Sequence, residues 1–186
     1  MIPLSSIEDI EALYAARGDL RYGEGVTQIE HALQCAQIVE ETVGEANLIV
    51  AALLHDIGHL FESETGAMQT DDRHEASGAN ALRVFFGDAV CNPIALHVAA
   101  KRYLCFREPD YYAALSAASQ KSLELQGGAF DAGKAEAFER LPYWREAVLL
   151  RRADDTGKRE EPSGRSFRDF MPLLRGLVTG GERFGP

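Results

Sequence analysis

The stretch Ala51-Ala-Leu-Leu-His55-Asp56-Ile-Gly-His59-Leu60 decides the fold of this 186-residue chain. An apolar run that begins at Leu48 leads into it and predicts a helix over residues 48–59, apolar on nearly all sides and therefore central to the core. The far end of this helix carries an imidazole and a carboxylate. A buried carboxylate needs a partner, and a cation is the most effective one. Taken alone, the pair has a second interpretation: His55 is a hydrogen-bonded core histidine and Asp56 ends the helix, without a bound cation.

Helix signals continue on both sides of this stretch. Ser5-x-x-Glu8 and Thr27-x-x-Glu30 are capping-box patterns, and Gly18 and Gly44 are expected to end the two helices. No alternating pattern typical of strands is found. The sequence predicts an all-α helical bundle of about nine helices. The remaining helices are expected over residues 74–86, 88–104, 110–115, 116–126, 131–141, 142–155 and 167–178, with loops at 61–73 and 156–165.

Length and composition indicate a single domain over residues 1–186, with a functional core over about 20–158 and a C-terminal tail at 159–186. The 46% apolar content is enough for a buried core. Three cysteines form an odd number without Cys-x-x-Cys spacing, which favours a reduced compartment. The N-terminus has no basic region followed by an apolar one, and the run 48–54 is too short to span a bilayer. These features predict a soluble, cytoplasmic protein.

The charge is distributed unevenly along the chain. With 29 acidic and 19 basic residues the net charge is −10, which argues against nucleic-acid binding through bulk charge. Residues 1–100 carry 16 acidic and 4 basic side chains, whereas residues 101–186 carry 13 and 15. All five histidines lie between His31 and His97. The two halves of the chain are therefore expected to face ligands of opposite charge.

Four more side chains can join the His-Asp pair in one site. Mixed imidazole and carboxylate ligands suit iron, manganese or zinc, and six of them are more than one catalytic metal needs. A pair of metals bridged by a carboxylate fits this number. Asp155 is the alternative to Asp154, although the three-residue spacing from Arg151 favours Asp154. The six candidate metal ligands are His31, His55, Asp56, His74, His97 and Asp154.

Residues able to donate hydrogen bonds to an anion follow several of these ligands at helical spacing. His59 lies four residues after His55, and Lys101 lies four residues after His97, so each pair shares a helix face. Arginine grips tetrahedral oxyanions through two bonds, while lysine acts as a point charge. A solvated helix face is the alternative for the basic residues, and His59 could instead orient a metal ligand.

The order His…His-Asp…His…His…Asp resembles that of the HD-domain metalloprotein superfamily, over most of the chain. Three segments, at residues 24–36, 51–60 and 97–104, look strongly like one branch of it. This branch contains the mixed-valent diiron oxygenases that cleave the carbon–phosphorus bond of 1-hydroxyphosphonates. Ser119, Gln126-Gly-Gly and the segment 151–155 match the same branch.

The resemblance implies a ligand set and two cofactors. Two iron ions would be bound, one in the ferrous and one in the ferric state, with O₂ as co-substrate; other divalent metals could occupy the site in purified protein. Asp56 would bridge the two ions. The first ion would be held by His31, His55, Asp56 and Asp154, and the second by Asp56, His74 and His97.

The resemblance also implies a substrate site. Glu24 would receive the amino or ammonium end of the substrate, and Tyr22 would cover an open iron position until substrate arrives. The family pattern is Tyr-x-x-Glu, whereas Tyr22-Gly-Glu24 is one residue shorter. Glu24 keeps its distance from His31, while the gating position of Tyr22 stays open. The phosphonate oxygens would be held by His59, Lys101, Ser119, Gln126 and Arg151.

These expectations describe a dinuclear-iron oxygenase that cleaves a small 1-hydroxy-2-aminoethylphosphonate-type substrate into a carboxylic acid and phosphate. The alternative enzyme is an HD-type metal-dependent phosphohydrolase or phosphodiesterase acting on a nucleotide or phosphate ester. A non-catalytic metal-binding module is a third possibility, against which the complete ligand set argues. The expected partner is a small-molecule phosphonate, with no nucleic acid and no membrane; the sequence does not indicate the number of subunits.

Overall fold

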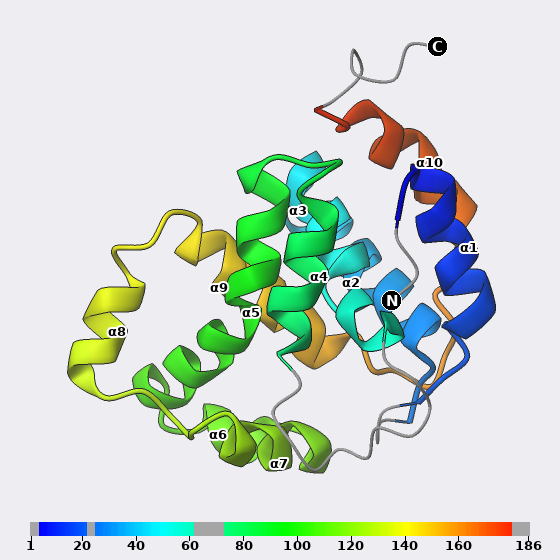
Figure 1. Cartoon of the computed structure of the whole chain (residues 1–186). Helices are drawn as coiled ribbons and strands as arrows, with labels where there is room; N and C mark the ends of the chain where they lie inside the picture. Colours follow the sequence, from blue (N-terminus) through cyan, green and yellow to red (C-terminus); the bar gives the residue numbers. More distant parts are fainter. Residues whose placement is uncertain (1–3, 22–24, 62–72, 180–186) are drawn as a thin grey trace.

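All regular secondary structure is helical in the computed structural model, which describes residues 4–21, 25–61 and 73–179 (Figure 1). This confirms the all-α fold, with ten α-helices and one 3-10 helix in the described ranges against about nine expected. The elements are α1 (Ile7–Arg17), α2 (Gln28–Thr42), α3 (Ala46–Leu54), η1 (Ile57–Phe61), α4 (His74–Leu82), α5 (Asp88–Arg107), α6 (Tyr111–Ala114), α7 (Ala117–Leu125), α8 (Ala132–Phe138), α9 (Trp144–Thr156) and α10 (Phe167–Gly176).

The core is built around α3, whose residues from Leu48 to Leu54 are all buried. Helices α2, α5 and α9 pack against α3, α9 also packs against α2 and α5, and α4 packs on α5. In Figure 1 these five helices fill the centre, while α8 extends to the left and α6 and α7 lie below. An almost wholly apolar helix is stable only when it is surrounded in this way, so the most apolar stretch of the sequence becomes the centre of the bundle.

The helix predicted over residues 48–59 is wrong in its second half. Helix α3 ends at Leu54, His55 and Asp56 form a turn, and the chain continues as η1. The turn brings the chain against the start of α4, where a Cβ on Gly58 would lie 2.1 Å from His74 O. A glycine permits this close approach of two backbones. The His-Asp pair therefore lies on a bend between elements and faces α4.

Helix α1 begins one residue later than its capping pattern indicated. Ser6, and not Ser5, caps the helix: its Oγ accepts from Asp9 N at 3.1 Å, and Asp9 Oδ2 accepts from Ser6 N at 2.9 Å. Ser5 Oγ donates to the same carboxylate, and Glu8 forms an ion pair with Arg175 instead. The prediction at Ser5 and Glu8 was wrong because the next serine and acid along the chain complete the box reciprocally.

The helix ends expected at two glycines are confirmed. Gly18 follows α1 and donates its N–H to Tyr14 O at 2.7 Å. Gly44 follows α2 with φ of +76°, a left-handed conformation that glycine adopts without strain. At the start of α2, Thr27 Oγ1 accepts from Glu30 N at 3.3 Å. The side chain of Glu30 accepts from Gln34 Nε2.

The C-terminal part of the described chain packs on the rest through two contacts. Gln34 of α2 binds the segment after α9: its Nε2 donates to Arg159 O at 2.9 Å and to Glu161 O at 3.0 Å. Helix α10 then packs along α1, and both lie on the right of Figure 1. An ion pair between Arg168 and Glu11 joins these two helices. Residues 159–179 thus close the bundle beside α1.

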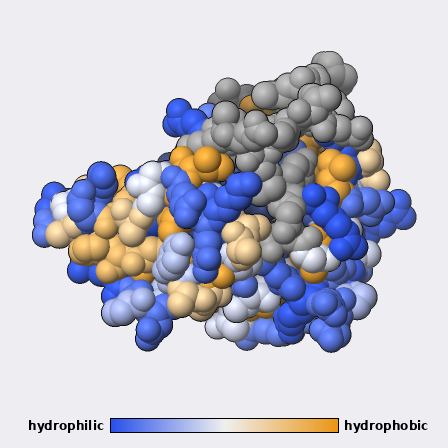
Figure 2. Space-filling model, turned by 90° about the horizontal axis from the view of Figure 1, so that it is seen from below, coloured by the Kyte–Doolittle hydropathy of each residue, from blue (hydrophilic) through white to orange (hydrophobic). Residues whose placement is uncertain are grey.

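A second, smaller apolar cluster lies where α5 meets α8. Tyr103 packs on Phe138 with ring centroids 5.0 Å apart, and Trp144 completes the aromatic group. Tyr103 and Trp144 are therefore packing residues. On the face seen in Figure 2, hydrophobic side chains are interspersed with hydrophilic ones. Within the described ranges, no helix combines the length and apolar character needed to cross a membrane.

Candidate metal centre and anion site

The structure brings the six predicted metal ligands together in the centre of the bundle. His31 comes from α2, His74 from the first residue of α4, His97 from α5 and Asp154 from α9, while His55 and Asp56 come from the turn after α3. Five of the six are buried, and the side chain of Asp56 is 15% exposed. Residues from five separate segments thus form one polar cluster inside an apolar core.

Asp56 lies between the four histidines. Its Oδ1 is 3.4 Å from His55 Nε2, 3.4 Å from His74 Nε2 and 3.7 Å from His97 Nε2. Its Oδ2 is 3.7 Å from His31 Nε2. One carboxylate therefore faces donors on both sides, which is the arrangement that a bridging ligand requires.

Asp154 lies beside two of the histidines only. Its Oδ1 is 3.3 Å from His31 Nε2 and 3.9 Å from His55 Nε2. Asp155 turns away from the histidines and binds Arg151 and Tyr111. The structure thus places Asp154, and not Asp155, in the cluster. The six donors thus divide into two groups that share Asp56. The first group adds His31, His55 and Asp154, and the second adds His74 and His97.

Backbone carbonyls orient three of the imidazoles. Nδ1 of His31 donates to Gly157 O at 2.7 Å, Nδ1 of His55 to Ala52 O at 2.9 Å, and Nδ1 of His97 to Ile94 O at 2.7 Å. A carbonyl can only accept, so each Nδ1 carries the proton and each Nε2 presents a lone pair. All three lone pairs lie at the cluster, which is how metal-binding histidines are oriented in proteins.

Two observations show that these donors fit metal ions. His55 is fully buried, and its Nε2 has no hydrogen-bond partner in the described part of the chain, a state that costs about 1–3 kcal/mol. The Nε2 atoms of His74 and His97 face each other at 3.2 Å. Nitrogens that bind one metal at about 2.1 Å lie at nearly this separation when they are at right angles. Metal ions would satisfy these nitrogens, one at His55 and one between His74 and His97.

Cys35 is a further donor near the cluster that the sequence did not single out. Its Sγ lies 3.6 Å from His31 Nδ1 and donates to Ala153 O at 3.5 Å. Burial raises the pKa of this thiol, although His31 opposes the shift. Because only the thiolate is a strong metal ligand, Cys35 packs against the ligand helix as a neutral side chain. Gly157 provides the space for it, since a Cβ there would lie 2.5 Å from Sγ.

The cluster holds its carboxylates ionised and keeps His55 and His97 neutral, whereas Cys35 and Asp154 outweigh burial and raise the pKa of His31 well above its usual value. Burial alone would raise the pKa of Asp56, but His55 and His74 outweigh it and hold that pKa well below the usual range. Burial would likewise raise the pKa of Asp154, but Arg151 and Lys158 outweigh it and hold that pKa well below the usual range. Burial, and then the neighbouring His55, lower the pKa of His97 well below its usual value. Anionic oxygens and neutral nitrogens are the protonation states that bind metal.

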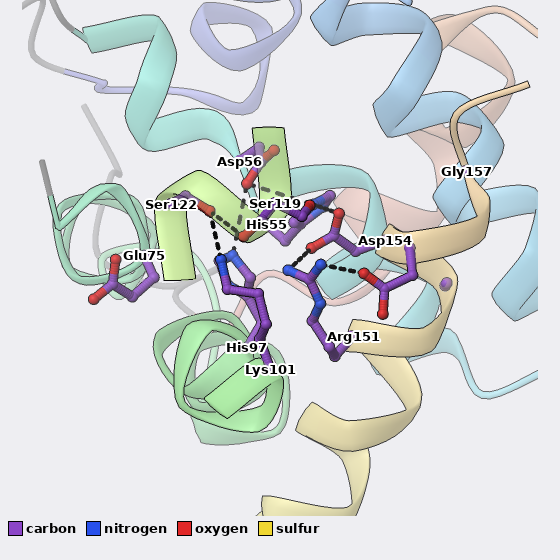
Figure 3. Close-up of polar contacts among 12 residues, drawn as sticks. His55, Asp56, Glu75, His97, Lys101, Ser119, Ser122, Arg151, Asp154 and Gly157 are labelled. Carbon is purple, nitrogen blue, oxygen red and sulfur yellow. Dashed lines mark hydrogen bonds and ion pairs between the residues drawn. The ribbon is translucent and has the colours of Figure 1, made fainter. Parts of the chain in front are cut away.

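Lys101 and Ser119, both predicted to bind an anion, are buried close to the cluster. Lys101 lies one turn after His97 on α5, and its Nζ donates to Ser122 Oγ at 2.7 Å (Figure 3). Ser122 Oγ in turn donates to Ser119 O at 3.0 Å. Burial, and then the nearby Arg151, lower the pKa of Lys101 to about 8.

Arg151 is engaged by protein groups on all of its nitrogens. Nη1 donates to Asp154 Oδ2 at 2.7 Å, Nη2 donates to Asp155, and Nε donates to Tyr111 Oη at 3.2 Å. Figure 3 shows its guanidinium between two carboxylates. In this arrangement the buried guanidinium fixes the position of Asp154.

Of the other predicted substrate residues, His59 and Gln126 are described by the structure, and two lie outside the described ranges. His59 stacks on His74 with ring centroids 3.9 Å apart. Gln126 ends α7, and its buried Oε1 has no hydrogen-bond partner among the described residues. Tyr22 and Glu24 lie outside the described residues, as does most of the loop expected at 61–73.

Sequence reasoning missed Lys158 and Ser122. Lys158 Nζ donates to Ser119 Oγ at 3.2 Å and lies 3.8 Å from Asp154 Oδ1. Both residues had a detectable signal, because Lys158 follows Asp154 by four residues and Ser122 follows Ser119 by three.

Comparisons with known proteins agree with this arrangement. The HD-domain family model matches residues 29–156, a range that contains all six clustered donors. The chain is 42% identical over 177 residues to a Leisingera caerulea protein named [1-hydroxy-2-(trimethylamino)ethyl]phosphonate dioxygenase (glycine-betaine-forming), covering 92% of this chain and 90% of that protein. It is 44% identical over 160 residues to hydroxymethylphosphonate dioxygenase of Gimesia maris, covering 84% and 80%. The chain therefore belongs to the HD-domain family, in the group of phosphonate dioxygenases.

Proposed function

We propose that this protein is an oxygenase that uses O₂ to cleave the carbon–phosphorus bond of a small 1-hydroxyphosphonate. The observation that carries the proposal is the arrangement of four imidazoles and two carboxylates in two groups that share Asp56, next to a buried ammonium. The names of two relatives that align over most of the chain describe this chemistry. The products are a carboxylic acid and inorganic phosphate.

The reaction balances with one O₂ for each phosphonate. The C1–H and C1–P bonds break, and C1 gives up four electrons, which reduce O₂. Of the two oxygen atoms, the net composition adds one to the carboxylic acid and one to the phosphate. The substrate hydroxyl stays on the carbon as part of the acid. No other reductant or oxidant is needed, so the reaction depends on O₂ alone.

We assign two iron ions to the cluster, because mixed imidazole and carboxylate ligands suit iron. When bound, they supply the activation of O₂ and the oxidation of C1. Asp56 would be the ligand shared by the two ions, and the backbone carbonyls behind His31, His55 and His97 keep each Nε2 directed at the cluster. Arg151 holds Asp154 in the orientation in which its Oδ1 faces His31 and His55.

The protein binds the substrate through its anionic end. Lys101 supplies a buried positive charge held by Ser122, and Ser119, whose carbonyl accepts from Ser122 Oγ, supplies a hydroxyl from the same helix. Gln126 contributes its amide from the end of α7, and His59 contributes its imidazole from η1. A substrate held between these groups places its C1 carbon at the cluster, so binding and positioning are achieved together.

The remaining assigned residues come from the segment before α2. Glu24 would receive the cationic end of an aminophosphonate, and Tyr22 is the candidate for covering a metal position, with a spacing to Glu24 one residue shorter than in the family pattern. Both assignments rest on the resemblance of the sequence around His31 to the phosphonate oxygenases.

The proposal is tested by phosphate release with and without oxygen. Iron-loaded protein is incubated in air and under argon with hydroxymethylphosphonate, 2-amino-1-hydroxyethylphosphonate and its N-trimethyl analogue. Phosphate is expected from at least one of them in air and from none under argon. Equal release under argon would contradict the proposal and would point to hydrolysis. A phosphate ester, such as p-nitrophenyl phosphate, serves as the hydrolase control and is expected to stay intact.

A further inference from the structure

A closed ring of hydrogen bonds holds one edge of the Arg151 guanidinium. Its Nη2 donates to one carboxylate oxygen of Asp155, and its Nε donates to Tyr111 Oη at 3.2 Å. Tyr111 Oη in turn donates to the other oxygen of Asp155. Burial raises the pKa of Tyr111, so its hydroxyl keeps the proton that it donates. The three bonds together fix the plane of the guanidinium.

The remaining nitrogen of the same guanidinium binds a candidate metal ligand. Nη1 of Arg151 donates to Asp154 Oδ2 at 2.7 Å (Figure 3). The other oxygen of this carboxylate, Oδ1, lies 3.3 Å from His31 Nε2 and 3.9 Å from His55 Nε2. Arg151 thus engages one oxygen of Asp154, while the other oxygen faces the histidines of the cluster.

An unrestrained arginine would bind this carboxylate differently. Arginine and carboxylate groups frequently pair through two parallel hydrogen bonds, which engage both carboxylate oxygens at once. The side chains of Arg151 and Asp154 are only 4% and 6% exposed, so their attraction is weakly screened by water. A two-bond pairing would therefore be favourable here and would take Oδ1 away from a metal ion. Such a pairing uses Nη2, which Asp155 holds in place together with Tyr111.

We propose that Tyr111 and Asp155 are positioning residues for the metal centre: they restrict Arg151 to one oxygen of Asp154 and so keep the other oxygen available to a metal ion. This inference rests on the proposed metal site, but not on the reaction with O₂. It gives Asp155 a role that acts through Arg151 instead of through direct ligation. It also extends the support of the centre to α6, which contributes Tyr111 but none of the six clustered donors.

A simpler role for the bond between Tyr111 and Asp155 is to anchor α6 to α9. In that case, loss of the tyrosine hydroxyl would destabilise the metal-free protein without a specific effect on metal affinity. A positioning role weakens metal binding at the group of donors that contains Asp154 and leaves the group with His74 and His97 unchanged. The two roles therefore differ in whether one of the two metal sites is affected alone.

The test titrates chelator-treated protein with Mn²⁺ and measures the affinity of each binding step by calorimetry. Tyr111→Phe keeps the aromatic ring and removes the hydroxyl. Tyr112→Phe is the matched control, because Tyr112 is the next residue of α6 and its side chain is exposed. Tyr111→Phe is also made in an Arg151→Met background, where no guanidinium remains to be positioned. His97→Ala identifies which binding step belongs to which group of donors.

Tyr111→Phe is expected to weaken the step that depends on Asp154 about 10-fold, at the low end of the losses seen when residues that orient metal ligands are changed. The other step is expected to stay unchanged, and Tyr112→Phe is expected to bind Mn²⁺ as the wild type does. In the Arg151→Met background, Tyr111→Phe is expected to have no further effect, because the two residues act as a unit.

Wild-type affinities for both steps in Tyr111→Phe would overturn the inference, as would equal weakening of both steps. A loss that persists in the Arg151→Met background would also overturn it, because Tyr111 would then act without Arg151. Asp155→Asn provides a second cycle that retains the guanidinium: combined with Tyr111→Phe, it is expected to cost less than the product of the two single losses, and fully independent losses would contradict a shared role. Because this readout needs no turnover, it stays valid if the protein cleaves no hydroxyphosphonate, whereas a wild type that binds no Mn²⁺ would contradict the metal centre itself and the inference with it.

Discussion

Asp56 lies within 4 Å of the Nε2 atoms of four histidines, although only His55 is its neighbour in sequence. The sequence could predict the six clustered donors, because ligand residue types stand out on apolar helices. It could not predict that one carboxylate oxygen faces three imidazoles while the other faces His31. That division depends on how five segments pack, and no local spacing encodes it.

For Arg151 and Lys158, the sequence spacing indicates the contact with Asp154 but not the contacts with distant segments. The spacing of Arg151 from Asp154 predicted their proximity, which the structure shows as a 2.7 Å hydrogen bond. The engagement of Arg151 by Tyr111, 40 residues earlier, is a tertiary contact that no sequence pattern announces. Lys158 stood at a recognisable four-residue spacing from Asp154, but its contact with Ser119 depends on where α7 packs.

Lys101 gives the protein a predictable pH dependence. Burial, and then Arg151, lower the pKa of Lys101 to about 8. Its ammonium is therefore present below pH 8 and is lost as the pH rises through 8. We expect the KM for the phosphonate to increase above pH 8, by up to about tenfold per pH unit, as the charged fraction falls.

Steady-state kinetics between pH 6.5 and 9.5 measure this effect, with Lys101→Arg as the control. An arginine keeps its charge throughout this range, so the KM of the variant is expected to show no increase that begins at pH 8. The same profile in both proteins would assign the titration to another group.

At the scale of elements, the turn between α3 and η1 is the largest departure from the expected helices. The apolar run correctly predicted a buried helix over 48–54, because its character is local to the sequence. The break at Leu54 follows from the approach of Gly58 to His74 O across a tertiary contact. This break is what lets His55 and Asp56 face α4 and α5 together.

The capping box of α1 yields a second prediction at this scale. Ser6→Ala removes the side chain that accepts from Asp9 N and is expected to lower the free energy of unfolding by about 1 kcal/mol. Ser5→Ala removes one exposed hydrogen bond to the same carboxylate and is expected to cost less than about 0.5 kcal/mol. Urea denaturation followed by circular dichroism measures both. A larger loss of stability for Ser5→Ala than for Ser6→Ala would contradict this assignment and would make Ser5 the N-cap, as the sequence pattern indicated.

At the scale of the whole molecule, the uneven charge becomes a feature of one site. The acidic half, residues 1–100, supplies five of the six clustered donors. The slightly basic half supplies Asp154 and the three cations Lys101, Arg151 and Lys158. Helices α5 and α9 pack against each other and bring the two groups together. The cluster that suits metal cations thus borders a site that suits one small anion.

The central position of the cluster predicts that metal binding stabilises the entire fold. A metal concentration about 1,000-fold above the Kd adds roughly 4 kcal/mol to the free energy of unfolding. For a protein of this size, this raises the Tm by about 10 °C. Differential scanning fluorimetry of chelated and iron-loaded protein measures the shift. His97→Ala removes a ligand from one of the two groups, and its shift is expected to be smaller than that of the wild type. Equal Tm values with and without metal would contradict the proposed site.

The most direct test of the oxygenase is the ratio of O₂ consumed to phosphate released. An oxygen electrode follows O₂ while a colorimetric assay follows phosphate, with iron-loaded protein and the best hydroxyphosphonate of the three. The balanced reaction predicts one O₂ for each phosphate at every time point. Phosphate release with no O₂ consumption would contradict oxygenative cleavage and would instead indicate a hydrolase.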